Sequence, residues 1–321
     1  MKRLFATILA ITLLFSTVIP AIADNGGGGG GAAYLKMGTG ARPLALGGAF
    51  TALAEGAAAT YYNPAGLGML KMREMETMHA VLTLDRNLDY FAYAQPIKNK
   101  KIGGVLSFGW IKYGVDGIPE TRIYNAGDVI PAGQAIGDPI LDAGGNVRVF
   151  SYFEDVENAY TLAYGKQMRE KVYAGAAVNF YTHKLFNNKA DGMGLDLGVL
   201  WLANERSKIG LTVKHLGAEL KWDTASARKD DIPVSTVLGA TYKIRKNIEA
   251  ALDLEKTGDE DLRPHLGIEG WVNKNLALRA GLDKDNLTLG LGFKNKEWCF
   301  DYGFADQDLG DVHRVSATKR F

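Results

Sequence analysis

The stretch NLTLGLGFKNKEWCFDYGFAD, residues 286–306, decides the fold of this 321-residue chain. In each half of it, large apolar residues alternate with small or polar ones, and the polar turn 294–296 (KNK) joins the halves. The large apolar residues are Leu287, Leu289, Leu291, Phe293, Trp298, Phe300, Tyr302 and Phe304. Because successive side chains of a strand point to opposite faces, this period of two indicates two strands, each with one apolar face.

The same alternation recurs along most of the chain and predicts 14 strands. Their expected ranges are 76–84, 88–97, 102–113, 156–167, 172–183, 192–202, 208–217, 232–243, 248–255, 263–272, 276–283, 286–294, 297–306 and 312–321. Most are close to the roughly 9 to 11 residues that a tilted strand needs to cross a bilayer.

The connections between these strands alternate in kind. Every second one is short and polar, at 98–101, 169–171, 204–207, 244–247, 273–275 and 294–296. The others vary from the tight turn 85–87 to the long segment 114–155, which we expect to be an extracellular loop. Short turns at one end and variable loops at the other are typical of a transmembrane barrel whose turns lie in the periplasm. The strands of this barrel would span residues 76–321.

A soluble β-sandwich or propeller would also alternate, with its apolar face as an ordinary core. Two features favour the membrane barrel. Aromatic residues gather at strand ends on the apolar face, as in an interfacial girdle: Trp110, Tyr113, Trp201, Trp298 and Tyr302. The chain also ends on Phe321, and outer-membrane barrels resemble one another in a terminal aromatic that the barrel-assembly machinery recognises.

The N-terminus is typical of an exported protein. Residues 1–23 combine Lys2 and Arg3, an apolar run and an Ala-Ile-Ala site, which predicts a signal peptide cleaved near Ala23. Residues 24–31 form a glycine-rich tether. The expected location is therefore the bacterial outer membrane, with its lipid bilayer as one partner.

Composition and motifs argue against catalysis and against nucleic acid. With 37 Lys and Arg against 36 Asp and Glu, the chain has no strong field for an acidic partner. The five histidines are isolated in sequence, so we expect them in solvated loops or at strand ends and predict no metal or cofactor site. No nucleophile motif is present, and we expect no enzyme.

Charged residues on the polar faces of the strands should point into the lumen, because a charge that faces lipid costs a few kcal/mol near the midplane. They are Asp196, Lys214, Glu249, Asp253, Glu269, Arg279 and Asp301. Their mixed signs favour a network that holds the barrel or a plug in shape. A permeation path lined by charges is the alternative.

Residues 32–75 precede the first strand and are rich in Ala, Gly and Leu. The run Ala45–Ala54 is compatible with a short helix, although Gly47 and Gly48 weaken it. Asn63-Pro64 ends any helix and sets a turn. Such small residues pack tightly inside another structure, so we expect a plug that enters the lumen from the periplasmic side. The predicted fold is all-β, a 14-stranded antiparallel transmembrane β-barrel with this N-terminal plug.

The segment MGTGARPLALGGAFTALAEGAAATYYNPAGL, Met37–Leu67, resembles the N-terminal signature of the FadL-like outer-membrane proteins and is most similar to their PorV/PorQ branch. The resemblance implies that the plug is a "hatch". By this match the hatch turn consists of Asn63, Pro64, Ala65 and Gly66. Its packing element consists of Gly40, Ala41, Arg42, Gly47, Gly48, Ala49 and Phe50.

The resemblance implies two alternative functions. FadL-like barrels bind or transport small hydrophobic molecules, such as fatty acids or hydrocarbons, through a lumen that the hatch gates. PorV-like barrels serve type IX secretion and dock exported proteins, for which the segment 114–155 would offer a surface. A general diffusion porin is a third hypothesis, which an occupied lumen would disfavour.

Overall fold

The structure is a computed structural model that describes residues 31–99, 101–123, 147–307 and 310–321. The predicted signal peptide 1–23, the tether before Gly31 and the middle of the predicted loop 114–155 lie outside these residues. The strands are β1 Glu74–Val81, β2 Arg86–Pro96, β3 Val105–Ile123, β4 Val147–Arg169, β5 Val172–Leu185, β6 Asn188–Trp201, β7 Ser207–Trp222, β8 Lys229–Asp231, β9 Ser235–Arg245, β10 Ile248–Thr257, β11 Arg263–Trp271, β12 Leu276–Asp283, β13 Asn286–Asn295, β14 Trp298–Ala305 and β15 Val312–Arg320.

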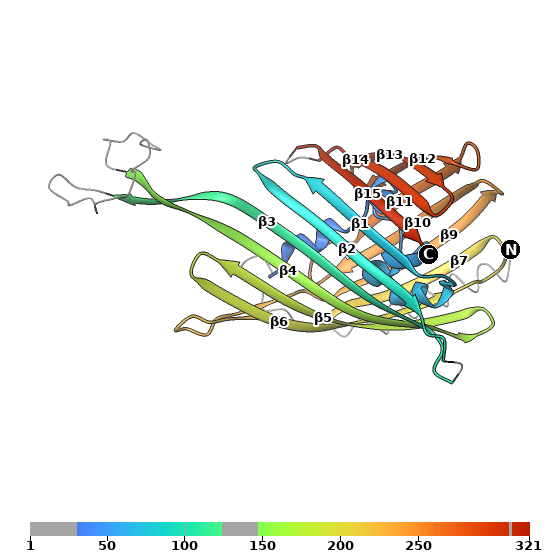
Figure 1. Ribbon diagram of the computed structural model, residues 1–321, viewed down its shortest axis with the longest axis horizontal. Helices are drawn as coiled ribbons and strands as arrows, with labels where there is room; N and C mark the ends of the chain where they lie inside the picture. Colours follow the sequence, from blue (N-terminus) through green and yellow to red (C-terminus); the bar gives the residue numbers. More distant parts are fainter. Residues whose placement is uncertain (1–30, 100, 124–146, 308–309) are drawn as a thin grey trace.

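These strands close into an antiparallel barrel. Each of β1 to β7 pairs with its neighbour in the chain, β7 pairs with β9, and the order continues to β15, which pairs with β1. The short strand β8 pairs only with β7 and lies outside the ring, which therefore has 14 strands. The predicted fold class is confirmed. In Figure 1 the strands run obliquely along the long axis of the barrel.

The outer surface of the barrel is apolar, as the alternation predicts. On β13, Leu287, Leu289, Leu291 and Phe293 are between 45% and 51% exposed, whereas Thr288 between them is 1% exposed. A face of large apolar side chains that no other part of the protein covers is suited to lipid. Among the residues that the structure describes, no helix is both long and apolar enough to cross a membrane.

Strands β3 and β4 depart from the predicted pattern. They continue for several residues into the range 114–155 that the sequence predicts as a loop, and they project beyond the rim at the left of Figure 1. Their pairing shifts register between Val115 and Ile118, where Gly117 has a φ of 70°. A bulge at this glycine breaks the alternation but not the pairing, which is why a pattern of period two ends too early here.

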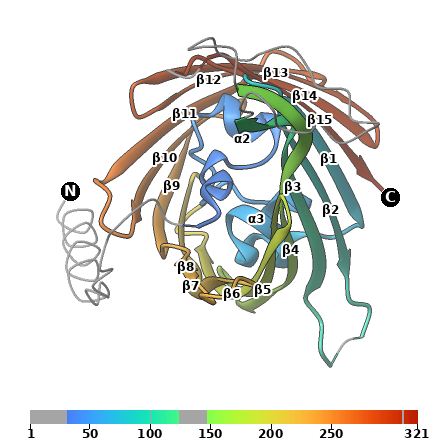
Figure 2. The ribbon, with the colours of Figure 1, turned by 90° about the vertical axis from the view of Figure 1, so that its left-hand side faces the viewer.

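Residues 31–73, which we call the plug, fill the interior of the ring (Figure 2). Their elements are the 3-10 helices η1 Ala33–Met37, η2 Gly56–Ala58 and η3 Pro64–Met69, and the short helices α2 Ala41–Ala45 and α3 Ala59–Tyr62. No helix forms over Ala45–Ala54, because Gly47 and Gly48 adopt φ of 63° and 85° and end α2. The prediction of a helix there is wrong.

The plug starts at the opposite end of the barrel from the predicted one. Gly31 N–H donates to Asp231 O, and Lys36 pairs with Glu260 in the β10–β11 connection, so the first described residues lie at the loop end. The segment then descends to η3, which packs on β4, β5 and β6, before it joins β1 at the short-turn end. The plug therefore spans the lumen lengthwise.

Glycines on the inner wall let the plug backbone lie directly against the strands. A Cβ added at Gly175 would lie 2.3 Å from the carbonyl carbon of Pro64, and one at Gly198 would lie 2.1 Å from Asn63 Oδ1. Other inner-wall glycines in contact with the plug are Gly165, Gly210, Gly239, Gly267, Gly281, Gly290 and Gly303. Much of the chain's glycine content thus serves close approach of wall and plug.

Replacing Gly175 tests this contact. Gly175→Val should displace the turn at Pro64 and destabilise the protein by about 1–3 kcal/mol, the usual range for overpacking. The measurement is the temperature at which the folded barrel loses its fast migration in a detergent gel. Ala174→Val, on the outer face of the same strand, is the control, and equal losses in both variants would contradict the close-contact assignment.

Candidate functional site

The lumen is the candidate site, and two of its predicted charges, Asp253 and Glu269, bind the plug directly. Asp253 on β10 is 1% exposed, and its Oδ2 accepts hydrogen bonds from Phe50 N at 3.0 Å and Thr51 N at 2.8 Å. A carboxylate that accepts two backbone N–H groups forms strong, charge-assisted hydrogen bonds. Asp253 therefore fixes the middle of the plug to the wall.

Arg42 on α2 connects the plug to a second group of wall charges. Its guanidinium donates to both oxygens of Glu269, at 2.8 Å and 2.9 Å, and to Glu55 at 3.0 Å. Arg279 then joins Glu269 at 2.6 Å to Asp301 at 2.7 Å. Burial disfavours the charged guanidinium, but these carboxylates outweigh burial and raise the pKa of Arg42 above its ordinary value.

The remaining three predicted lumen charges have different surroundings. Asp196 is buried and accepts a hydrogen bond from His215 N at 2.8 Å. Lys214 is buried against the rings of Tyr61 and Tyr62. Glu249 is half-buried, and its Oε1 has no hydrogen-bond partner. The network interpretation thus accounts for Asp196, Asp253, Glu269, Arg279 and Asp301, but leaves Lys214 and Glu249 without an assigned partner.

The hatch turn is held by the side chain of Asn63, which is fully buried. Its Oδ1 accepts from Ala65 N at 3.1 Å, and its Nδ2 donates to Thr51 O at 3.1 Å and to Val199 O at 3.2 Å. Pro64 occupies the first position of η3, where its missing N–H removes no helical hydrogen bond. Gly66 lies where a Cβ would clash with Ala54 O. One amide thus joins two parts of the plug to β6.

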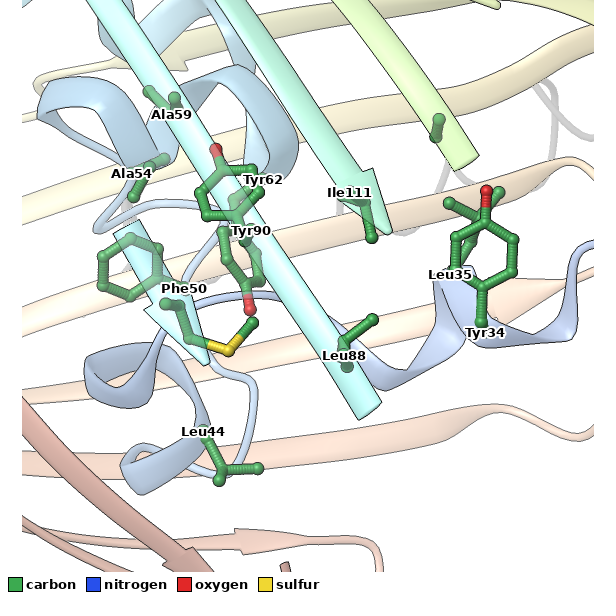
Figure 3. Close-up of a cluster of buried hydrophobic side chains, with 14 of the residues drawn as sticks. Tyr34, Leu35, Leu44, Phe50, Ala54, Ala59, Tyr62, Leu88, Tyr90 and Ile111 are labelled. Atoms are coloured by element: carbon green, nitrogen blue, oxygen red, sulfur yellow. The ribbon is translucent and has the colours of Figure 1, made fainter. Parts of the chain in front are cut away.

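The predicted packing element lies along β10–β15, with Ala41 N–H donating to Ser316 Oγ of β15 at 2.7 Å. Gly47 N–H donates to Thr288 Oγ1 at 3.0 Å, and Gly47 O is 2.8 Å from His265 Nδ1. Ala49 and Phe50 are buried in the apolar cluster of Figure 3, where the Phe50 and Tyr62 rings meet edge to face at 5.1 Å. The plug therefore shares a hydrophobic core with the wall, to which Leu88, Tyr90 and Ile111 contribute.

Several residues that hold the plug were not found from the sequence. Arg314 is 1% exposed and donates to Met37 O at 2.6 Å and Gly38 O at 3.0 Å. His265 and His215 are buried; His265 lies near the start of β11, as expected of a strand-end position, whereas His215 lies in the middle of β7, where the expectation of a solvated loop or strand end is wrong. For His265 the alternation of β11 was an available signal, because it shares the inward face with Glu269; for His215 there was none, because it follows the inward-facing Lys214. In the described part of the chain, no cluster of three His, Cys, Asp or Glu side chains could hold a metal ion.

The predicted assembly signal, Phe321, lies at the short-turn end. Its N–H donates to Arg73 O at 2.9 Å, and its ring is 44% exposed between the cationic groups of Arg73 and Lys319. The final residue is thus joined to the last residue of the plug.

Two cavities of more than about 200 Å³ flank the plug. One of about 330 Å³ lies near the loop end, where Leu35 and Tyr61 of the plug face Lys214, Glu255 and His265 of the wall. A second, of about 250 Å³, lies at the short-turn end beside Glu55, Glu74 and Arg320. Between them the lumen is occupied by the α2 and η3 parts of the plug and their wall contacts.

Asn63→Asp tests how the plug is held. The change removes both Nδ2–H donors and places a buried carboxylate opposite two carbonyl oxygens, which should cost about 3 kcal/mol or more. Limited proteolysis should then cut within residues 46–70, which the native protein protects. Asn187→Asp, at the exposed β5–β6 turn, is the control, and native protection of the Asn63 variant would contradict the role of its amide.

Comparison with known proteins places this geometry among solved barrels. The model of an uncharacterised protein family, UPF0164, matches residues 28–130, about a third of the chain. No curated protein matches the chain.

Solved structures match over most of the length. The toluene transporter TbuX of Ralstonia pickettii is 13% identical with a TM-score of 0.56, over 88% of this chain and 98% of that one. The monoaromatic hydrocarbon channel CymD is 14% identical with a TM-score of 0.57, over 89% and 98%. A Pseudomonas aeruginosa FadL homologue is 11% identical with a TM-score of 0.53, over 88% and 98%. At such identities the likeness concerns the fold, which is that of the FadL-type barrels.

Proposed function

We propose that this protein is an outer-membrane channel that binds and passes small, largely hydrophobic molecules around its plug. The observation that carries the proposal is the cavity of about 330 Å³ between the plug and the wall at the loop end. Its size falls within the range of about 300–1,000 Å³ that is usual for ligand pockets. The similar barrels TbuX and CymD are named for toluene transport and for monoaromatic hydrocarbons.

The hatch would gate this route by local movement. The lower plug is fixed through Asp253, Arg42 and Asn63, whereas residues 31–38 cover the cavity. At its solvent side this cover is held by the exposed Lys36–Glu260 pair, a kind of pair that contributes little, and by Gly31 N–H to Asp231 O, whereas Arg314 binds its inner end at Met37 and Gly38. Gly38 and Gly40, with φ of 69° and 75°, offer a hinge. We infer that a permeant displaces the cover first and the plug middle afterwards.

The proposal includes export and assembly. Cleavage near Ala23 would release the mature chain, and the barrel-assembly machinery would recognise Phe321 at the short-turn end. The apolar outer face, as on β13, supports insertion into a bilayer.

Uptake and conductance together test the channel. In a host strain without its own hydrocarbon channel, the protein should raise the rate of toluene entry several-fold over an empty vector. In planar bilayers its conductance should be small, because the plug fills the lumen. Absence of uptake would contradict the proposal, and a large steady conductance would favour a general diffusion porin.

A second candidate function is docking of exported proteins, as in the PorV/PorQ branch. The observation that favours it is the extension of β3 and β4 beyond the rim, where Ile118–Ile123 pairs with Val147–Phe153. The paired neighbours of these strands end earlier, at Arg86 opposite Val115 and at Leu185 opposite Asp155. Both edges therefore lack a strand partner within the described part, and such edges can accept an added strand.

Shortening this extension tests the docking function. Replacing residues 118–153 with a short turn should leave the barrel intact and abolish co-purification of envelope proteins from the native membrane. Toluene uptake by the same variant serves as the control for folding. An unchanged set of co-purified proteins would contradict the docking function.

A further inference from the structure

Lys214 differs from the other buried basic residues of the lumen. In the described ranges three Lys or Arg residues are classed as buried: Lys214, Arg279 and Arg314. Both arginines donate hydrogen bonds, Arg279 to carboxylates and Arg314 to plug carbonyls. Lys214 is 8% exposed, and its ammonium lies 4.1 Å from the ring centre of Tyr61 and 5.4 Å from that of Tyr62. No oxygen atom accepts a hydrogen bond from it.

The tyrosine rings compensate only part of the cost of burying this charge. A cation over an aromatic face is attracted by the ring, but the ring offers the ammonium no conventional hydrogen-bond acceptor, and Lys214 lines the cavity. The hydroxyls of both tyrosines are already used, Tyr61 with Leu35 O and Tyr62 with the backbone of Thr39. Lys214 therefore has donor capacity that the protein itself does not fill.

The carboxylates near Lys214 are engaged elsewhere. Glu255 accepts from Ser235 Oγ at 2.6 Å and is 3.2 Å from His265 Nε2. Asp253 binds the plug amides through Oδ2, while its buried Oδ1 has no hydrogen-bond partner, and Asp196 Oδ1 accepts from the N–H of His215. Asp283, on the same cavity, forms two hydrogen bonds of 2.7 Å with Arg263. The acids thus balance the charge around the cavity without supplying Lys214 with a hydrogen-bond acceptor.

An irregularity of β7 fixes Lys214 at this place. His215 has a φ of 61° and Gly217 a φ of 64°, and the pairing with β6 shifts register on both sides of Leu195. As a result His215 is buried beside Lys214, although consecutive residues of a strand normally face opposite sides. Tyr181 OH, 2.8 Å from His215 Nδ1, holds the bulge. Bulges of this kind commonly re-aim side chains next to functional sites.

The cavity of about 330 Å³ places apolar groups opposite the ammonium. Its lining includes Leu35 and Leu44 of the plug and Ile232 and Val237 of the wall, together with Lys214 and the Tyr61 ring. A ligand that fits this lining has an oxygen acceptor at one end and an apolar or aromatic body at the other.

We propose that Lys214 is the specificity-determining residue of the lumen, and that the cavity takes small carboxylates with an apolar or aromatic body in preference to bare hydrocarbons. The proposal rests on the proposed channel function and names its substrate class. In the bound state the carboxylate accepts from the Lys214 ammonium, and the body lies on Tyr61 and the apolar lining. A hydrocarbon of equal size would leave the ammonium without an acceptor.

Benzoate and toluene are the matched probes. Each has one aromatic ring, which carries a carboxylate in benzoate and a methyl group in toluene. Equilibrium dialysis with the full-length mature protein in detergent should show benzoate bound at least tenfold more tightly. Lys214→Met should lower benzoate affinity about tenfold or more, the range expected for a hydrogen bond to a charged group, and leave toluene affinity unchanged or higher. Lys214→Arg should retain most of the benzoate affinity.

Lys112→Met, which removes an exposed lysine of β3, is the control and should change neither affinity. If Lys214→Met fails the gel test of folding, Lys214→Gln replaces it. Equal binding of toluene and benzoate to the native protein would overturn the proposal without any variant, as would unchanged benzoate affinity in a folded Lys214 variant. Uptake of both probes separates the two proposals. If neither probe enters, the channel function is contradicted. If both enter and bind equally well, only the role of Lys214 is contradicted.

Discussion

Direct contact between the plug backbone and the inner wall is the constraint on which the rest of the structure depends. At nine inner-wall glycines, Gly175 and Gly198 among them, the wall touches the plug with no side chain between them. The backbone N–H and C=O groups of the plug must then find partners on the wall itself, because buried polar groups without hydrogen bonds are costly. Asp253, Thr288, Ser316 and Arg314 provide such partners.

This constraint explains why a barrel of FadL-type fold has so many charges in its lumen. Asp253 and Glu269 serve the plug, and Arg279 and Asp301 extend the network from Glu269 along the wall. The space left for a ligand is confined to the two ends of the lumen. Its polarity depends on the wall charges that form no hydrogen bond or ion pair with the plug. Lys214 is the buried cation for which this matters.

The alternation of apolar and polar residues predicted the 14 barrel strands, because strand periodicity is a local property, and six of the seven charges that it assigned to inward faces are buried. It could not predict which charges would meet. The pairing of Arg42 with Glu269 joins residues 227 positions apart and depends on how the plug is threaded. His265 looked isolated for the same reason, since its partners Gly47, Glu255 and Asp283 come from three separate segments. The β3–β4 extension was missed because a glycine bulge interrupts the periodicity without ending the strands.

The path of the plug from the loop end to β1 has a consequence for how the barrel is made. The seam of the ring, where β1 meets β15, joins the first and last strands of the sequence, so the ring can close only after the chain is complete. By then the plug, which precedes β1, already exists, and the wall contacts it on almost every side. The plug runs directly into β1, and the N–H of Phe321, just after β15, donates to Arg73 O, so the plug and both sides of the seam are joined at the short-turn end.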